Sequence, residues 1–122
     1  MGTFSVGVTL TGPAGVRETL PLLVDTGATF VVVPQPVAAR LGLTPVRAVP
    51  VQLGGGQRVE LPVAEVRVTV EGLSVTTPCF ISPDGLALLG AVALESLLLA
   101  ADPVGKRLVP TEGIVAAGAG LR

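Results

Sequence analysis

Residues 22–33 (LLVDTGATFVVV) constrain the fold more than any other stretch, because they place one acidic side chain between two apolar runs. Both runs are rich in Leu and Val, and the β-branched Val favours strands. A carboxylate is costly to remove from water unless it is hydrogen-bonded, paired or used in chemistry, and neither run offers Asp25 a Lys, an Arg or a His. The sequence therefore predicts a buried acid at a turn between two strands.

The residue types that the chain lacks narrow the chemistry. It contains no His, which excludes Ser/His/Asp and Cys/His triads and imidazole metal sites. The lone Cys79 excludes a disulfide within the chain and a Cys-rich metal site, and its apolar neighbours indicate a small core residue. Carboxylates are the main catalytic candidates left, and we expect no metal ion and no other cofactor.

Composition favours one small all-β domain. Hydrophobic residues make up 49% of the 122 positions, enough for a core, and 16 Gly with 11 Pro favour short strands joined by tight turns. No repeat, linker or low-complexity tract divides the sequence. We therefore expect residues 1–122 to form a single domain.

Charge and the first residues limit the expected partners. A net charge of -1 provides no basic surface for nucleic acid, and no apolar run reaches the roughly 18 residues that a membrane span needs. The first residues lack the charged and apolar regions of an export signal, and Val6 stands where a myristoylation signal has Ser or Thr. We expect a cytoplasmic protein that binds neither nucleic acid nor membranes, with its apolar excess in a dense core or a subunit interface.

Alternating apolar residues predict the strands. They are expected at residues 4–10, 16–24, 29–33, 49–53, 59–63, 66–70, 75–79, 86–89 and 108–109, with hairpins around residues 11–15, 54–56 and 71–72. A further acid, Asp84, lies in a Pro-Asp-Gly sequence typical of turns and, unlike Asp25, is not followed by Thr-Gly. We therefore interpret Asp84 as a structural residue.

Two helices are expected. The first begins at Pro36, which suits a first helical turn, and ends at Gly42, which suits a C-terminal cap. The second covers residues 91–101, with Leu94, Leu97 and Leu98 on one face, and ends before Pro103.

Residues 113–120 are small and apolar, and they form either a strand at a dimer interface or a frayed tail.

The glycines at residues 54–56 form the tip of the central hairpin. A phosphate-binding loop would need a helix N-terminus directly after the glycines, whereas residues 59–63 have the pattern of a strand. Two interpretations stay open, namely a plain flexible hairpin and a flap that covers a substrate.

The sequence from Asp25 to Ala28 resembles the catalytic loop of aspartic peptidases, and the whole chain is similar to the single-domain retropepsin-like members. As in bacterial members, a helical stretch follows the loop, a Gly-rich hairpin lies mid-chain, and residues 88–90 (LLG) precede a second apolar helix. The resemblance implies an all-β, closed retropepsin-like barrel with one or two short helices. It also implies the site residues: Asp25 as the catalytic acid, Thr26, Gly27 and Ala28 as the active-site loop, Leu53, Gly54, Gly55, Gly56 and Gln57 as the substrate-binding flap, and Leu88, Leu89 and Gly90 as structural support.

Aspartic proteolysis needs two carboxylates that share one proton, yet this chain carries one Asp-Thr-Gly. The inference is a homodimer that places two Asp25 side chains across a two-fold axis and hydrolyses an extended peptide or unfolded protein. The sequence departs from known relatives, since it has no Tyr for a pepsin-like flap, and Ala91 stands where viral retropepsins carry an Arg.

Two other functions fit the same barrel. One is a peptide-binding module that captures an extended chain without cutting it. The other is a purely structural dimerisation domain in which the apolar excess serves assembly alone, although a rigid interface would gain nothing from three consecutive glycines. For Asp25-Thr26-Gly27 itself, the alternative is an inactive relic or a hydrogen-bonded turn Asp.

Overall fold

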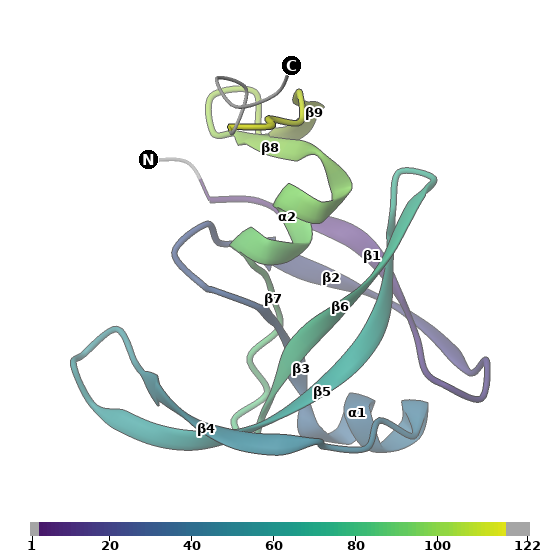
Figure 1. The fold of residues 1–122 in the computed structure, drawn as a ribbon, viewed down its shortest axis with the longest axis vertical. Coiled ribbons are helices and arrows are strands. Elements are labelled where there is room, and N and C mark those ends of the chain that lie inside the picture. Colours follow the sequence, from purple (N-terminus) through teal and green to yellow (C-terminus); the bar gives the residue numbers. More distant parts are fainter. Residues whose placement is uncertain (1–2, 117–122) are drawn as a thin grey trace.

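The computed structural model describes residues 3–116 and has a mostly β fold with two short helices, α1 and α2 (Figure 1). The elements are β1 (Ser5–Thr11), β2 (Arg17–Val24), β3 (Val31–Pro34), α1 (Gln35–Leu41), β4 (Arg47–Gln52), β5 (Arg58–Val70), β6 (Leu73–Ser82), β7 (Leu88–Leu89), α2 (Ala91–Leu97), β8 (Leu99–Asp102) and β9 (Arg107–Pro110). None of the helices in this part of the chain is both long and apolar enough to cross a membrane.

The large sheet closes on itself. Its strand order is β1-β2-β7-β3-β6-β5-β4, and β1 pairs with β5 as well, with Leu10 opposite Val68. These pairings join β1, β2, β7, β3, β6 and β5 in a ring, to which β4 is attached through β5 alone. The expected closed all-β barrel is therefore confirmed.

Strand β5 belongs to both the barrel and a projecting hairpin. Its 13 residues pair with β4 over Arg58–Val63 and with β6 over Val63–Val70. The sequence predicted two strands here, at residues 59–63 and 66–70, but the backbone continues through the residues between them. The β4–β5 hairpin (residues 47–63) thus extends away from the barrel on the end of a barrel strand (Figure 1).

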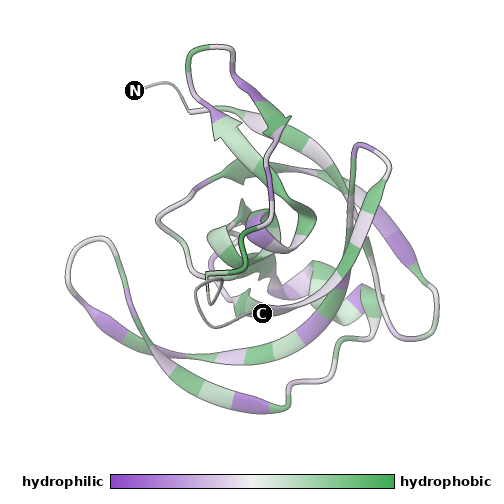
Figure 2. Ribbon diagram, turned by 45° about the horizontal axis from the view of Figure 1, so that its top comes forward, coloured by the Kyte–Doolittle hydropathy of each residue, from purple (hydrophilic) through white to green (hydrophobic). Residues whose placement is uncertain are grey.

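The barrel interior holds the main core. Apolar and polar residues alternate along many of the strands, as the banded colours of Figure 2 show, and the apolar ones meet inside. The most deeply buried core residues include Val8, Leu10, Leu22, Val31, Val33, Val66, Val68, Cys79 and Leu89. Cys79 is a core residue as expected, and burial raises the pKa of its thiol to about 12, so the thiol stays protonated at neutral pH.

Helix α1 is short, as the sequence predicted, and packs against β2, β3 and β6. It has a Pro in its first turn, ends at Gly42 in the left-handed conformation (φ 71°), and buries Val37, Ala38 and Leu41. Arg40 forms an ion pair with Glu18 of β2 at 2.7 Å. The hydrogen bond from Arg40 lowers the pKa of the Glu18 carboxyl, which therefore stays charged at neutral pH.

Helix α2 is shorter than expected. The prediction of residues 91–101 was wrong because Leu98 adopts a left-handed conformation (φ 55°) and ends the helix after Leu97. The next residues form β8, which pairs with β9 in a separate two-stranded sheet. Leu98 is also 47% exposed, so only Leu94 and Leu97 of the three expected leucines are buried on α2.

Other predictions changed in their extent. The strands expected at residues 29–33 and 86–89 are limited to β3 and β7, and Leu86 is exposed rather than buried. The strand at residues 108–109 is confirmed as part of β9. Of residues 113–120, only 113–116 are described and they form no strand; the rest of that predicted segment lies outside the described residues.

Candidate active site

Asp25 lies directly after β2, and the barrel holds its backbone in place. Strand β2 runs parallel to β7, with Leu23 opposite Leu88 and Val24 opposite Leu89. The pairing continues one residue further, since the Asp25 N–H donates to the Leu89 carbonyl at 3.0 Å. The carboxylate thus projects from a loop that begins at a fixed point of the sheet.

The loop folds back on the carboxylate. The Gly27 N–H donates to Asp25 Oδ1 at 2.9 Å, and the Ala28 N–H donates to the Asp25 carbonyl at 3.1 Å. A Cβ atom at Gly27 would lie 3.2 Å from Asp25 Oδ1, a tight contact, so glycine suits the close approach of backbone and carboxylate. Asp25 is half-buried rather than buried as the sequence predicted, because this open loop leaves it partly in contact with solvent.

Gly90 packs closely against the other side of the loop. A Cβ atom there would lie 2.7 Å from the Ala28 carbonyl oxygen and would collide with the Phe30 carbonyl. The absence of a side chain lets α2 begin against the loop, where the Ala91 N–H donates to the Ala28 carbonyl at 2.8 Å. The structure therefore brings residues 88–90 against the loop that carries Asp25, while the role that the sequence assigned to them stays a prediction.

The glycine-rich tip forms a closed turn at the end of the β4–β5 hairpin. The Leu53 N–H donates to the Gln57 carbonyl at 2.7 Å, and the Gly56 N–H donates to the Leu53 carbonyl at 2.9 Å. Gly56 has a φ of 85°, which favours glycine. All residues from Leu53 to Gln57 are exposed, so the main-chain groups that these two bonds do not use are available to a ligand.

A second apolar cluster lies between this hairpin and the Asp25 loop. We call it the outer cluster. It consists of buried Val32, Leu61, Val63, Phe80 and Leu88 with partly buried Leu23, Ala28, Phe30, Val49 and Val51. Their strand neighbours, such as Val31, Val33 and Cys79, belong to the main core. Because adjacent strand residues point to opposite faces, the outer cluster covers the outside of the barrel wall.

The outer cluster was not identified from the sequence. Its two rings, Phe30 and Phe80, lie 4.8 Å apart between centroids and come from distant parts of the chain. One signal could have indicated it, namely the run Val31-Val32-Val33, because a strand without polar alternation is buried on both faces. The outer cluster gives the barrel an apolar, partly exposed surface beside the Asp25 loop.

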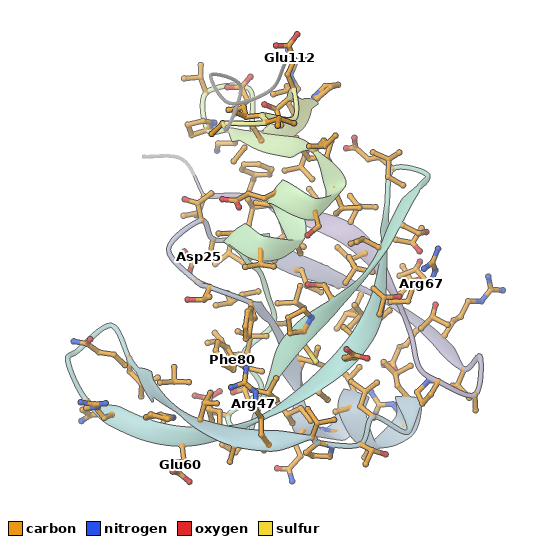
Figure 3. The ribbon with its side chains drawn as sticks, viewed as in Figure 1. Asp25, Arg47, Glu60, Arg67, Phe80 and Glu112 are labelled. Carbon is orange, nitrogen blue, oxygen red and sulfur yellow. The ribbon has the colours of Figure 1, made fainter. Side chains whose placement is uncertain are left out.

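A hollow of about 600 Å³ lies on the other side of Asp25, and none of the described β4–β5 hairpin residues lines it. Its walls come from the loop (Asp25, Thr26), from the start of the chain (Phe4), from α2 (Leu94) and from β8 (Leu99). We call it the α2 hollow. Asp25 thus lies between an apolar surface under the β4–β5 hairpin and an open hollow beside α2. Figure 3 shows Asp25 next to α2.

Of the other acids of the described chain, Glu95 lines the α2 hollow together with Asp25, whereas Asp84 is hydrogen-bonded elsewhere. Asp84 accepts a hydrogen bond from the Ser82 hydroxyl and a second from the Leu86 N–H at 3.3 Å. The Ser82 hydroxyl, followed by the Leu86 N–H, lowers the pKa of Asp84. Asp84 is therefore a turn residue, as expected. Within residues 3–116, no three His, Cys, Asp or Glu side chains come together as a metal site would require.

Comparisons with known proteins agree with this geometry. EIAV protease in complex with the inhibitor HBY-793 superimposes with a TM-score of 0.61 at 22% identity, over 86% of this chain and 90% of that protein. None of the curated proteins matches the sequence significantly. A family model described as aspartyl protease matches residues 6–98, which include the Asp25 loop, the β4–β5 hairpin and α2. The chain therefore belongs to the retropepsin-like aspartyl protease family.

Proposed function

We propose that the protein is an aspartic endopeptidase in which Asp25 is the catalytic acid. The observation that carries the proposal is the placement of Asp25, which is half-buried on a glycine-closed loop that is hydrogen-bonded to β7. Ion pairs in the described chain join Arg40 to Glu18 and Arg107 to Asp102 and leave the Asp25 carboxylate unpaired. Such an acid is free to bind and activate a water molecule.

The reaction needs a second Asp25 from another copy of the chain. One carboxylate takes a proton from water as the resulting hydroxide attacks the peptide carbonyl, while the other, which is protonated, donates a hydrogen bond to the carbonyl oxygen. The tetrahedral intermediate then collapses as the C–N bond breaks and the leaving nitrogen takes up a proton from the dyad. Thr26 is exposed beside Asp25, and we assign its hydroxyl to a hydrogen bond with the partner's loop.

The α2 hollow supports a homodimer. A second copy that brings its Asp25 beside the first must cover the surface around Asp25 and Thr26, and both residues border the α2 hollow. Three exposed apolar side chains lie in the C-terminal part of the chain, which also supplies Leu99 to the wall of the α2 hollow. Val104 is 93% exposed, Ile114 is 87% exposed and Val115 is 74% exposed. Contact with a second copy would remove them from water.

The β4–β5 hairpin is assigned to the substrate. Its exposed tip from Leu53 to Gln57 offers main-chain groups to an extended peptide, and the outer cluster beneath it offers an apolar surface for the peptide's side chains. We assign the whole chain, residues 1–122, to one peptidase domain. The expected cytoplasmic location stays a prediction.

The test compares the wild type with Asp25→Asn on an unfolded protein substrate, with the molar mass of each measured in the same samples. We expect cleavage to fall by at least about 100-fold, since removal of a general acid or base commonly costs this much. The mass should stay that of a dimer, because Asn keeps the shape of the side chain. Cleavage that persists in Asp25→Asn would contradict the proposal.

A peptide-binding module without catalysis is the second candidate. The outer cluster and the hairpin are complete within one chain, whereas a catalytic dyad needs two chains. A monomer that binds an extended peptide and does not cut it would favour this candidate.

A further inference from the structure

We propose that Arg47 selects substrates that carry an acidic side chain several residues away from the cleaved bond. The inference rests on the proposed function in that it assumes a peptide lying between the β4–β5 hairpin and the barrel. It requires binding of that peptide, with or without cleavage.

The sheet register places Arg47 at the end of a continuous row of side chains. Val63 lies opposite both Arg47 and Phe80. The row continues across the barrel wall, because Phe80 pairs with Val32, Val32 pairs with Leu88, and Leu88 pairs with Leu23. Residues paired in register point to the same face of a sheet. Arg47 therefore stands on the face of the sheet that carries the outer cluster.

Arg47 is the charged end of an otherwise apolar row. The other members, Leu23, Leu88, Val32, Phe80 and Val63, all belong to the outer cluster. On the β4–β5 hairpin, the pairs Val49 with Leu61 and Val51 with Val59 continue the same apolar face toward the tip. Glu60 pairs with Pro50 and points to the opposite side, as Figure 3 shows for Glu60 and Arg47.

The guanidinium of Arg47 has no acidic partner in the described chain. Within residues 3–116, the ion pairs are those of Arg40 with Glu18 and of Arg107 with Asp102. Arg47 is exposed, so a ligand can reach its guanidinium. A guanidinium offers several donors in a fixed fork that fits a carboxylate, which makes an acidic side chain its natural ligand.

The distance along β4 sets the position of the preferred acid. Arg47 precedes Leu53 of the tip by six residues, about 20 Å of extended strand. If the tip covers the cleaved bond, the peptide residue that meets Arg47 lies several residues to one side of that bond. The long side chains of Arg47 and of the peptide acid shorten the separation that the backbone must span. The substrate class is thus a peptide with apolar residues around the cleaved bond and one acid toward its end.

The experiment uses quenched fluorescent peptides that differ only in one residue, Glu, Gln or Lys, placed three, four or five residues to either side of the bond. For the wild type we expect kcat/KM to be about two- to fivefold higher with Glu than with Gln at one of these positions, the usual size of an exposed ion pair. The preference should weaken as salt is added. Arg47→Gln should abolish it, and Arg47→Glu should reverse it toward Lys.

Arg58→Glu is the matched control. Arg58 lies on the same hairpin, carries the same charge and pairs with Gln52 on the face opposite to Arg47. This variant should leave the Glu preference intact. If Arg47→Glu keeps the wild-type preference, or if Arg58→Glu removes it equally, the inference is overturned.

Binding separates this inference from the proposed function. The Asp25→Asn variant is titrated with the same peptides by fluorescence anisotropy, alone and combined with Arg47→Glu. A Glu preference in Kd that Arg47→Glu reverses supports the role of Arg47 even if the wild type cuts no peptide, a result that would refute the peptidase proposal alone. Equal Kd values for Glu, Gln and Lys peptides, or no binding of any of them, would overturn the role of Arg47.

Discussion

The β4–β5 hairpin and the β8–β9 hairpin (residues 99–110) both lie outside the barrel, and they differ in where their apolar side chains go. Val49 and Val51 of β4–β5 are partly buried in the outer cluster of the same chain. Val104, in the turn of β8–β9, is 93% exposed. Leu99 and Leu108 of β8–β9 are buried in the main core, so the contrast lies in its turn, where Val104 has no covering partner among residues 3–116.

The turns of the two hairpins differ in how firmly hydrogen bonds and residue type hold their backbones. The tip of β4–β5 carries three consecutive glycines, whose backbone has many conformations available when free. In the turn of β8–β9, Asp102 Oδ1 accepts hydrogen bonds from the Val104 N–H at 3.1 Å and the Gly105 N–H at 3.0 Å. From this difference we expect the first hairpin to move over a ligand and the second to hold a fixed contact with the proposed second copy.

The double variant Val104→Glu/Ile114→Glu tests the second half of this comparison and should have the largest effect. If these side chains are buried between two copies, charges there would weaken the dimer by at least about 100-fold, since each buried aliphatic side chain contributes roughly 1.5–3 kcal/mol. Light scattering should then give the mass of a monomer, and activity should be lost on dilution.

Val46→Glu provides the control for this variant. Val46 is 71% exposed, but it lies just before β4, away from the α2 hollow. The Val46→Glu variant should keep the molar mass of the wild-type dimer. A double variant that stays a dimer at micromolar concentration would place the subunit contact elsewhere.

Gly55→Pro tests the mobility of the first hairpin. A Cβ atom at Gly55 would meet no atom within 4 Å, so the folded tip has room for a side chain. Proline restricts the backbone, and we expect kcat/KM to fall about tenfold with little change in the melting temperature. Gly55→Ala, which keeps the N–H and more of the freedom, should have a smaller effect. Unchanged kinetics in Gly55→Pro would reduce the tip to an ordinary turn.

Ala28→Thr probes the loop that lies between the two regions. Two carboxylates in contact retain one shared proton over an intermediate pH range, so kcat/KM should follow a bell-shaped pH profile. A Thr hydroxyl at residue 28 could donate a hydrogen bond that stabilises the charged carboxylate, which should shift both limbs toward acid by about half a pH unit. Ala28→Val has a similar shape without the hydroxyl and should cause no such shift. Equal profiles for Thr and Val would contradict this account.

The barrel and the Asp25 loop could be predicted from the sequence because their signals are local. Alternating apolar residues defined the hairpins, and Gly42 marked the end of α1, where the left-handed conformation favours glycine. The turn at Asp84 was also predictable, because its hydrogen bonds reach only two residues along the chain.

The parts that could not be predicted depend on contacts between distant residues. Leu98 ends α2 in a left-handed conformation that a leucine does not favour, and the pairing of β8 with β9 accompanies this ending. Phe30 and Phe80 meet only because β3 and β6 lie side by side. The exposure of Asp25 likewise depends on how far the folded loop leaves it open, which its apolar neighbours in the sequence did not reveal.

Acid titration of the β8–β9 turn sharpens the contrast between the two turns and should give the smallest effect. The hydrogen bond from the Gly105 N–H, helped by those from the Val104 N–H and Arg107, lowers the pKa of Asp102 from its ordinary value of 3.8. A carboxyl whose pKa is lower in the folded state stabilises the fold above its unfolded pKa, and this contribution is lost as the pH falls through the folded pKa. Asp102→Asn keeps an oxygen acceptor for the turn but removes the charge. We therefore expect Asp102→Asn to lower the melting temperature slightly at pH 7, and the difference from wild type to shrink below about pH 4.

Gln57→Asn, at the tip of the other hairpin, is the control. It adds no charge, so its melting temperature should differ from that of the wild type by the same amount at both pH values. A melting-temperature difference for Asp102→Asn that is constant from pH 7 to pH 2.5 would show that the charge of Asp102 does not fix this turn.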